Sequence, residues 1–420
     1  MIVYFKKLNK RGMKVWSKVL FFLILFSSVQ HINSQNIRSS GPIMELPVKA
    51  GKKYLDPYFT KNQLGESVMC FTEYDIKKDE NVMCFTVYNS ELKQFKEIRI
   101  IEESRGMQAH AESMSKLGIK SDGTILAVFR IKERNPENRF AGSLYYVSSS
   151  NQGETWSKKQ KLVKDPTAQS QSFFDIARLG NGELGMVWLD SRRVENQTYG
   201  SCLYFGTTGN GIDFSNQKVI VSGTCQCCRT DIQVAKDNGV HVALRMMNEE
   251  NIRDMYYMNS DDHGLNFSEK QNISPDQWKI GGCPHTGPSM AGGQDRLGVA
   301  WYTMGGSPGV YFAYNESGVF SQRNLIEEHG AHPQLAKYGS EDYALVFEET
   351  HPELENYDRT ISFSIVRDGI ESSRTEISEK DSDNSHPVIS TVSEQEVLVV
   401  WSEIGESVSR LKYRLIEILD

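Results

Sequence analysis

Residues 260–267 read SDDHGLNF, and two earlier windows have a similar form: SSNQGETW at 149–156 and TTGNGIDF at 207–214. Each window starts with a hydroxyl residue, continues with a short polar residue or glycine, then a glycine, and ends in an aromatic residue. Asn and Asp side chains bond to their own backbone in turns, and glycine accepts positive φ. We therefore predict a tight hairpin at each window, with its aromatic residue packed between sheets. The three aromatic residues are 58 and 53 residues apart, a period typical of four-stranded propeller blades.

These windows resemble the Asp-box (BNR) repeat of the sialidase-like superfamily of β-propellers. The third window matches the whole S-x-D-x-G-x-x-F pattern, the first has Asn151 in place of Asp, and the second has Gly209 there. In that family the box is a structural hairpin on the face opposite the active site. The resemblance therefore implies a fold and not an activity.

A second landmark occurs seven times: a run of alternating apolar residues that ends in an aromatic residue or leucine and is followed by a polar residue. The core residues of the seven copies are Phe71, Phe129, Trp188, Leu244, Trp301, Phe347 and Trp401, separated by 58, 59, 56, 57, 46 and 54 residues. We predict an all-β chain with a single β-propeller of seven four-stranded blades, in which the landmark is the second strand. Closing the sheets into a ring removes exposed edges. Six blades, as in true sialidases, is the alternative.

The first residues have the order of a secretory signal: basic residues, the apolar run VLFFLILF at 19–26, then small residues. We predict a signal peptide at 1–34, an irregular lead-in at 35–54 and the propeller domain at 55–420. The apolar run is shorter than the roughly 20 residues of a membrane span. We therefore expect an exported protein, periplasmic or extracellular, with no membrane span after signal cleavage.

The charge of the chain argues against nucleic acid as a partner. Residues 1–34 carry six basic and no acidic side chains, so their removal would change the net charge from −7 to −13. A nucleic-acid-binding domain is usually basic. We expect a monomer that binds a small molecule or glycan.

The innermost strand of each blade starts at the face where the longer charged loops lie. Counting back 15 to 17 residues from six of the seven landmarks gives Asp56, Gln171, Cys228, His285, His332 and His386, with His110 as the candidate in the longer second repeat. Imidazole and thiolate are ligands that suit zinc and copper. We predict a zinc or copper site at this mouth of the axis, with the candidate ligands Cys225, Cys227, Cys228, Cys283, His285, His332 and His386. The alternative is that these residues only bond to neighbouring blades.

Two cysteine segments open the fourth and fifth repeats: CQCCRT at 225–230 and WKIGGCPHTGP at 278–288. With Arg253-Asp254 between them, they resemble a narrower group of secreted sialidase-like proteins that carry C-x-C-C-x-T and G-C-P-x-x-G-P. The resemblance covers most of the mature chain and implies no settled activity; the group usually has a short polar pair where this chain has His-Thr.

Other uses of the cysteines stay open. Cys283 can form a disulfide with Cys225 or Cys227, Cys70 can pair with Cys84, and we expect Cys202 in the core.

A sialidase needs an arginine cluster for the substrate carboxylate and a tyrosine nucleophile activated by a glutamate. The sequence FRIK at 129–132 contains the arginine and isoleucine of the family's Arg-Ile-Pro triplet but lacks the proline. The candidate ligand-binding residues are Arg130, Asp190, Arg192, Arg229, Arg245 and Arg253, and the candidate catalytic residues are Asp190, Arg245 and Glu348. No spacing singles out a tyrosine and glutamate pair, although Tyr302 and Tyr311 are candidates.

Three functions remain. The first is an exported propeller that binds a ligand at the axial mouth, through a metal or without one, with catalysis left open. The second is an exo-sialidase-like glycoside hydrolase. The third is a structural or protein-binding propeller.

Overall fold

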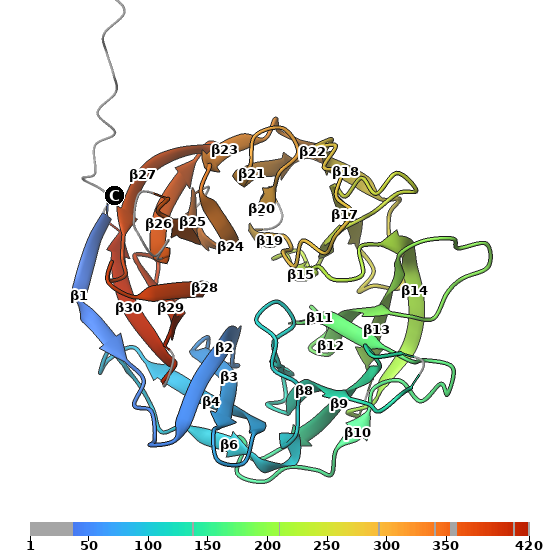
Figure 1. Ribbon diagram of the computed structural model, residues 1–420, viewed down its shortest axis with the longest axis horizontal. Helices are drawn as coiled ribbons and strands as arrows, with labels where there is room; N and C mark the ends of the chain where they lie inside the picture. Colours follow the sequence, from blue (N-terminus) through green and yellow to red (C-terminus); the bar gives the residue numbers. More distant parts are fainter. Residues whose placement is uncertain are drawn as a thin grey trace, which may run out of the picture. The chain divides into compact units, whose positions relative to one another are not determined.

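Seven antiparallel sheets account for most of the described chain, which comprises residues 37–136, 138–209, 211–292, 295–339, 342–352, 359–405 and 408–418 of a computed structural model. The sheets are arranged around an axis, and the first strand of each blade lies nearest the centre (Figure 1). The prediction of an all-β propeller with seven blades is confirmed, and the six-bladed alternative is wrong. Among the described residues, no helix has the length and apolar character needed to cross a membrane.

The first four blades follow the chain in order. Blade one contains β2 (Lys52–Lys61), β3 (Ser67–Asp75), β4 (Glu80–Asn89), β5 (Gln94–Phe95) and β6 (Arg99–Ile101). Blade two contains β7 (Lys116–Ile119), β8 (Ile125–Lys132), β9 (Gly142–Ser149) and β10 (Gln160–Lys161). Blade three contains β11 (Gln171–Arg178), β12 (Leu184–Asp190), β13 (Ser201–Thr208) and β14 (Phe214–Thr224). Blade four contains β15 (Asp231–Val234), β16 (Val240–Arg245), β17 (Met255–Ser260) and β18 (Gln271–Ser274).

Of the last three blades, only blade seven takes a strand from the other end of the chain. Blade five contains β19 (Ser289–Gly292), β20 (Arg296–Thr303), β21 (Gly309–Glu316), β22 (Val319–Phe320) and β23 (Asn324–Glu327). Blade six contains β24 (Gly330–Tyr338), β25 (Asp342–Thr350), β26 (Arg359–Arg367) and β27 (Ile370–Glu376). Blade seven contains β28 (Asp383–Thr391), β29 (Glu396–Ile404), β30 (Arg410–Ile418) and β1 (Ile37–Glu45).

The seven landmark residues all lie on the second strand of their blade and are buried. Their strands are covered on both faces, because each sheet packs between two neighbouring sheets. Seven apolar clusters result, and most contain residues from two adjacent blades. Burial on both faces explains why these strands read as nearly continuous apolar runs.

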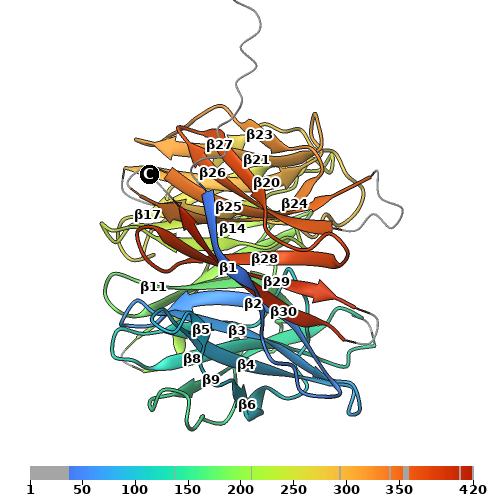
Figure 2. The same ribbon diagram turned by 90° about the vertical axis from the view of Figure 1, so that its left-hand side faces the viewer.

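Strand β1 closes the ring. It pairs with β30 in antiparallel register, from Ile37 opposite Ile418 to Glu45 opposite Lys412, and the two strands lie side by side in Figures 1 and 2. The expected irregular lead-in at 35–54 therefore differs from the structure, since most of it belongs to β1 and the start of β2. Its pairing partners are 367 to 381 residues away, so local sequence did not reveal the strand. The predicted signal peptide at 1–34 lies outside the described residues and stays a prediction.

The first and third hairpin windows share one set of hydrogen bonds. The amide of Gly264 donates to Ser260 Oγ at 2.9 Å, and the amide of Asn266 donates to Asp262 Oδ1 at 2.7 Å. The corresponding bonds at Gly153 and Thr155 measure 2.9 and 3.0 Å. The hairpin between β17 and β18 is at the opposite end of its sheet from the cysteines that precede β15, as the strand register requires.

Candidate functional site

Four innermost strands share an unusual backbone feature near their start. In β2, β11, β24 and β28 a bulge interrupts the pairing with the second strand. One residue in each bulge has positive φ: Asp56 at 54°, Phe173 at 46°, His332 at 49° and His386 at 49°. Positive φ is uncommon outside glycine and costs free energy, and such residues often occur where a side chain must be aimed at a site.

The strand register corrects the predicted alignment of the repeats. His332 and His386 occupy equivalent positions, as predicted, but blade three presents Phe173 there and not Gln171. By the same register, Arg229 and Gly287 stand at this position in blades four and five. Cys228 precedes this position by one residue, and His285 precedes it by two. The number of residues between this position and the landmark differs among the repeats, and counting back from the landmark does not detect the difference.

Five side chains meet across the axis, and we call Glu112, Arg229, His332, Glu348 and His386 the axial cluster. Glu112 Oε1 lies 2.9 Å from Arg229 Nη1, 2.8 Å from His332 Nδ1 and 3.9 Å from His386 Nε2. Its other carboxylate oxygen is buried and has no hydrogen-bond partner among the described residues. Glu112 precedes β7, in a segment that reaches toward the centre of the ring (Figure 1). Contacts from blades four, six and seven therefore converge on the carboxylate of Glu112, which belongs to blade two.

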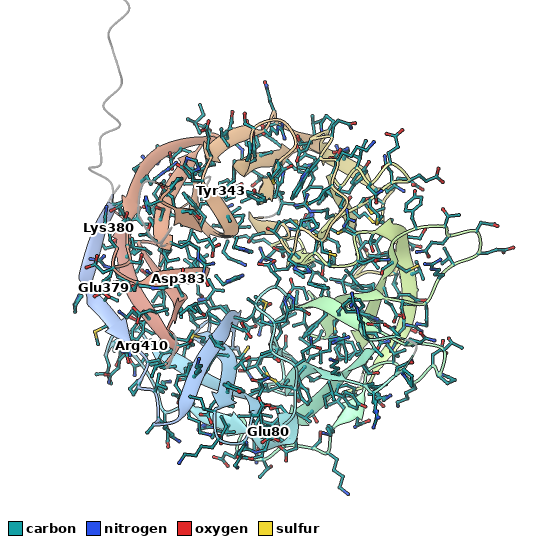
Figure 3. The ribbon with its side chains drawn as sticks, viewed as in Figure 1. Glu80, Tyr343, Glu379, Lys380, Asp383 and Arg410 are labelled. Atoms are coloured by element: carbon teal, nitrogen blue, oxygen red, sulfur yellow. The ribbon has the colours of Figure 1, made fainter. Side chains whose placement is uncertain are left out.

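A second carboxylate lies on the other side of the two imidazoles. Glu348 Oε1 is 3.5 Å from His332 Nε2, and Glu348 Oε2 accepts the backbone amide of His386 at 3.1 Å. Arg359 is 3.5 Å from Glu348 and forms two bonds with Asp383, at 2.7 and 2.8 Å; Asp383 starts β28 and is labelled in Figure 3.

Exposure differs within the axial cluster. The imidazole side chains of His332 and His386 are 19% and 21% exposed, whereas the Glu112 and Glu348 side chains are 2% and 5% exposed. The imidazoles therefore form the solvent-facing part of the cluster.

The surroundings shift the pKa values of the two imidazoles in opposite directions. Burial lowers the pKa of His332, but Glu348 and Glu112 outweigh it, and the pKa is raised above its usual value. Burial and the neighbouring His332 lower the pKa of His386 to about 4. Burial also opposes ionisation of Glu112, but Arg229 and His332 outweigh it and lower the pKa of Glu112 to about 2. The ring centres of the two histidines are 4.2 Å apart, so two imidazoles whose pKa values are shifted in opposite directions stand side by side.

The cysteines form a separate group, and we call Cys225, Cys227, Cys228, Cys283 and His285 the thiol cluster. Cys225 Sγ lies 3.8 Å from Cys227 Sγ and 3.2 Å from Cys228 Sγ. Cys227 also lies within 4.8 Å of the ligand atoms of Cys283 and His285. The predicted seven-residue metal set is therefore divided: five members are in the thiol cluster, and His332 and His386 are grouped with Glu112.

All seven cysteines lie within the described residues and are free thiols. The disulfides considered for Cys283 are not formed. Cys70 and Cys84 lie on paired strands but are not opposite each other, because Cys70 faces Phe85 and Cys84 faces Phe71. Cys202 is fully buried, as expected.

The predicted arginine set does not converge on one acceptor. Arg130 Nε donates to the Gln171 carbonyl at 2.8 Å. Arg192 forms two bonds with Asp190, at 3.1 and 2.8 Å. These side chains tie loops together.

The other candidates lie in different surroundings. Arg245 donates to the carbonyls of Arg253 and Tyr302, at 2.9 and 2.7 Å. Arg229 joins the axial cluster, and among the three catalytic candidates Glu348 does so as well. Asp190 is fully enclosed between Trp188 and Arg192.

A buried ion pair lies between the innermost strands of blades two and three. Lys116 Nζ lies 2.7 Å from Asp175 Oδ1, and Tyr58 donates to the same oxygen at 3.0 Å. The amide of Ile232 donates to Asp175 at 2.9 Å, and the amide of Met290 donates to Asp231 at 2.7 Å. These bonds join the innermost strands of blades one to five.

A cavity of about 240 Å³ lies farther along the innermost strands, toward their far ends, and includes Lys61, Gln233 and Lys337 in its lining. Burial lowers the pKa of Lys61 to about 8, and its ammonium group donates to Ser67 Oγ at 3.0 Å. The lining mixes polar and apolar side chains. We place the candidate functional centre at the axial cluster because several titratable side chains converge there.

Sequence reasoning missed Glu112. It follows His110 by two residues, and His110 was considered as the strand-start residue of the second repeat. An acidic residue beside that histidine was the available signal. Its partners come from other blades, with sequence separations of 117 and 220 residues for Arg229 and His332, so spacing did not connect them.

The described chain is therefore a seven-bladed β-propeller with a histidine and carboxylate cluster at one mouth of its axis. No family model and no curated protein matches it. The fold is shared with solved structures that include polysaccharide lyases.

Three of the similar structures illustrate this. The polysaccharide lyase Uly1 has a TM-score of 0.53 at 12% identity, over 94% of this chain and 96% of that one. A protein of unknown function from Dyadobacter fermentans has a TM-score of 0.52 at 13% identity, over 91% and 99%. A variant of NanB sialidase from Streptococcus pneumoniae has a TM-score of 0.47 at 10% identity, over 92% and 98%. At these identities the likeness concerns the fold alone.

Proposed function

We propose that this chain is an exported propeller that binds a glycan at the axial cluster, with His386 as the proton acceptor in cleavage of the bound chain. The observation that carries the proposal is the contact between two imidazoles whose pKa values are shifted in opposite directions, beside the buried carboxylates of Glu112 and Glu348. Neighbouring titratable groups whose pKa values are pushed apart are typical of acid–base sites.

The two histidines have different roles in this proposal. His332 is bonded to Glu112 through Nδ1 at 2.8 Å and faces Glu348 through Nε2 at 3.5 Å, so the two carboxylates favour its cationic form. His386 Nδ1 lies 3.0 Å from Ser385 Oγ, while its Nε2 is 3.9 Å from Glu112, beyond hydrogen-bond distance. A neutral imidazole with this nitrogen directed at a bound ligand would accept a proton. His332 positions His386 and keeps it neutral.

The positive charge of Arg229 favours a glycan over a metal ion as the ligand of the axial cluster. Arg229 lies 2.9 Å from the same Glu112 oxygen that faces both histidines. Its positive charge would repel a divalent cation at that place. We therefore no longer propose His332 and His386 as metal ligands.

Two considerations support a glycan as the ligand. The fold neighbours with TM-scores above 0.5 include proteins named as polysaccharide lyases. The exposed edges of the imidazoles, flanked by carboxylates and guanidinium groups, offer both donors and acceptors to sugar hydroxyls. The sialidase alternative has less support, because the predicted arginines are bonded to separate loops.

The test combines binding and cleavage. The purified protein is mixed with a panel of acidic and neutral polysaccharides, and both retention on the polysaccharide and release of new chain ends are measured. We expect binding to at least one polysaccharide and chain cleavage by the wild type. His386→Gln should lower the cleavage rate by at least about 100-fold, the usual contribution of a positioned base, with smaller loss of binding.

His263→Asn serves as the matched control. His263 lies in the third hairpin window, at the far end of blade four, and has φ of 58°, which asparagine tolerates. The control should bind and cleave as the wild type does. Absence of binding across the whole panel, or equal cleavage by the His386→Gln variant, would refute the proposal.

A further inference from the structure

The thiol cluster gathers three segments that are distant in sequence. The amide of Cys225 donates to the Arg245 carbonyl at 2.9 Å, which holds the cysteine turn against the end of β16. The amide of Arg253 donates to the Trp278 carbonyl at 2.9 Å, which holds the segment containing Cys283 beside it. The backbone thus brings four cysteines and one histidine to the boundary between blades four and five.

The spacing of the sulfur atoms fits ligands of one ion. A tetrahedral ion with metal–sulfur bonds of about 2.3 Å places its sulfur ligands about 3.8 Å apart. Cys225 and Cys227 have this separation, 3.8 Å, and Cys228 is 3.2 Å from Cys225. Cys283 and His285 approach from the side of Cys227, so one of them can complete four-coordination.

Charged groups around the cluster favour thiolates. Arg253 Nη1 lies 3.0 Å from Cys225 Sγ. Arg253 is in turn held by Arg245, which bonds its carbonyl at 2.9 Å and stacks 4.8 Å from the Trp278 ring. Such bonds to ligand atoms orient ligands and balance the excess negative charge of several thiolates.

We infer that the thiol cluster binds one thiophilic metal ion, Zn²⁺ or Cu⁺, through Cys225, Cys227 and Cys228, with Cys283 or His285 as the fourth ligand. Thiolate and imidazole ligands select these ions over Mg²⁺ or Ca²⁺, which prefer oxygen. Three buried cysteines and an arginine directed at one sulfur are unusual for plain apolar packing. The inference does not depend on the proposed glycan function.

A bound ion would also order the axial cluster. Arg229 directly follows Cys228 and carries the bond to Glu112. Fixing Cys228 by a metal therefore fixes the backbone from which Arg229 extends. In this role the ion is structural, and it stabilises the mouth of the axis.

The test measures zinc and copper per chain in protein purified without added metal. The wild type should contain about one ion per chain, Zn²⁺ or Cu⁺. Cys227→Ser should lose it, because Cys227 belongs to both groups of candidate ligands. Cys202→Ser is the control, since Cys202 is buried in blade three and bonded to Gln197, and it should keep the ion. His285→Ala identifies the fourth ligand: loss of affinity assigns His285, and retention assigns Cys283.

Cobalt provides a second measurement on the wild type, in case the Cys227→Ser variant does not fold. Metal-free wild-type protein is titrated with Co²⁺, and intense thiolate-to-cobalt absorption should appear at one equivalent. The inference is overturned if neither zinc nor copper is present and no such absorption develops. It is also overturned if Cys227→Ser folds with an unchanged metal content, or if the native protein contains a Cys225–Cys228 disulfide by mass spectrometry.

Discussion

Replacing Gly264 by alanine tests how tightly the third hairpin window packs against the neighbouring blade. A Cβ atom at this position would lie 2.2 Å from Cε1 and 2.3 Å from Cζ of Phe205. Phe205 is buried in blade three and packs edge-on against Phe267, with ring centres 5.1 Å apart. The ring is therefore confined, and the added methyl group must displace it or the hairpin.

Two costs add at Gly264. Its φ is +85°, and a residue with a Cβ pays about 1–2 kcal/mol in the left-handed region. Overpacking a buried aromatic ring costs about 1–3 kcal/mol more. We expect Gly264→Ala to lower the free energy of unfolding by roughly 2–5 kcal/mol.

Gly318→Ala isolates the backbone cost. Gly318 has φ of +84°, and a Cβ there would meet no atom within 4 Å, so we expect a loss of only about 1–2 kcal/mol. The assay is the midpoint of urea unfolding for both variants, in the wild type and in a Phe205→Leu background, where the clash is relieved. Equal shifts for the two glycine variants in the wild type, or no reduction of the Gly264→Ala cost in the Phe205→Leu background, would refute this reasoning.

Two further predictions concern the buried carboxyl group of Asp231 and the closure of the ring by β1. Burial and the charge of Asp175 raise the pKa of Asp231 to about 7. As the pH rises from 4 to 7, the wild type should therefore lose up to about 1.4 kcal/mol of unfolding free energy per pH unit, relative to Asp231→Asn. Parallel pH dependence of the two urea midpoints would contradict this. Deleting residues 37–45 removes β1 and exposes the edge of β30, so the shortened chain should aggregate at concentrations where the full chain is monomeric in light scattering.

The blades could be predicted because their signal is local. Each second strand is covered on both faces, so it carries a nearly continuous apolar run that ends at Trp188, Trp301 or an equivalent residue. The spacing of these runs predicts seven sheets. The same local reading failed at β1, whose residues have no partner within their own part of the chain.

Part of the candidate site could also be predicted from local sequence. His332 and His386 could be named as candidates because both stand at the start of an innermost strand, and Cys225 through Cys228 because their spacing is unusual. Glu112 was missed, and Arg130 and Arg192 were assigned to a ligand site although they bond loops.

The amino-acid order by itself determined the repeat, the buried strand of each blade and the types of side chain at the start of the innermost strands. These properties depend on residues close together in the chain. Only the closed ring decided which of those side chains meet, because contacts across an axis join residues from several blades. Glu112 with Arg229 and His332, and the thiol cluster with Arg253, exist only once the sheets are arranged around that axis.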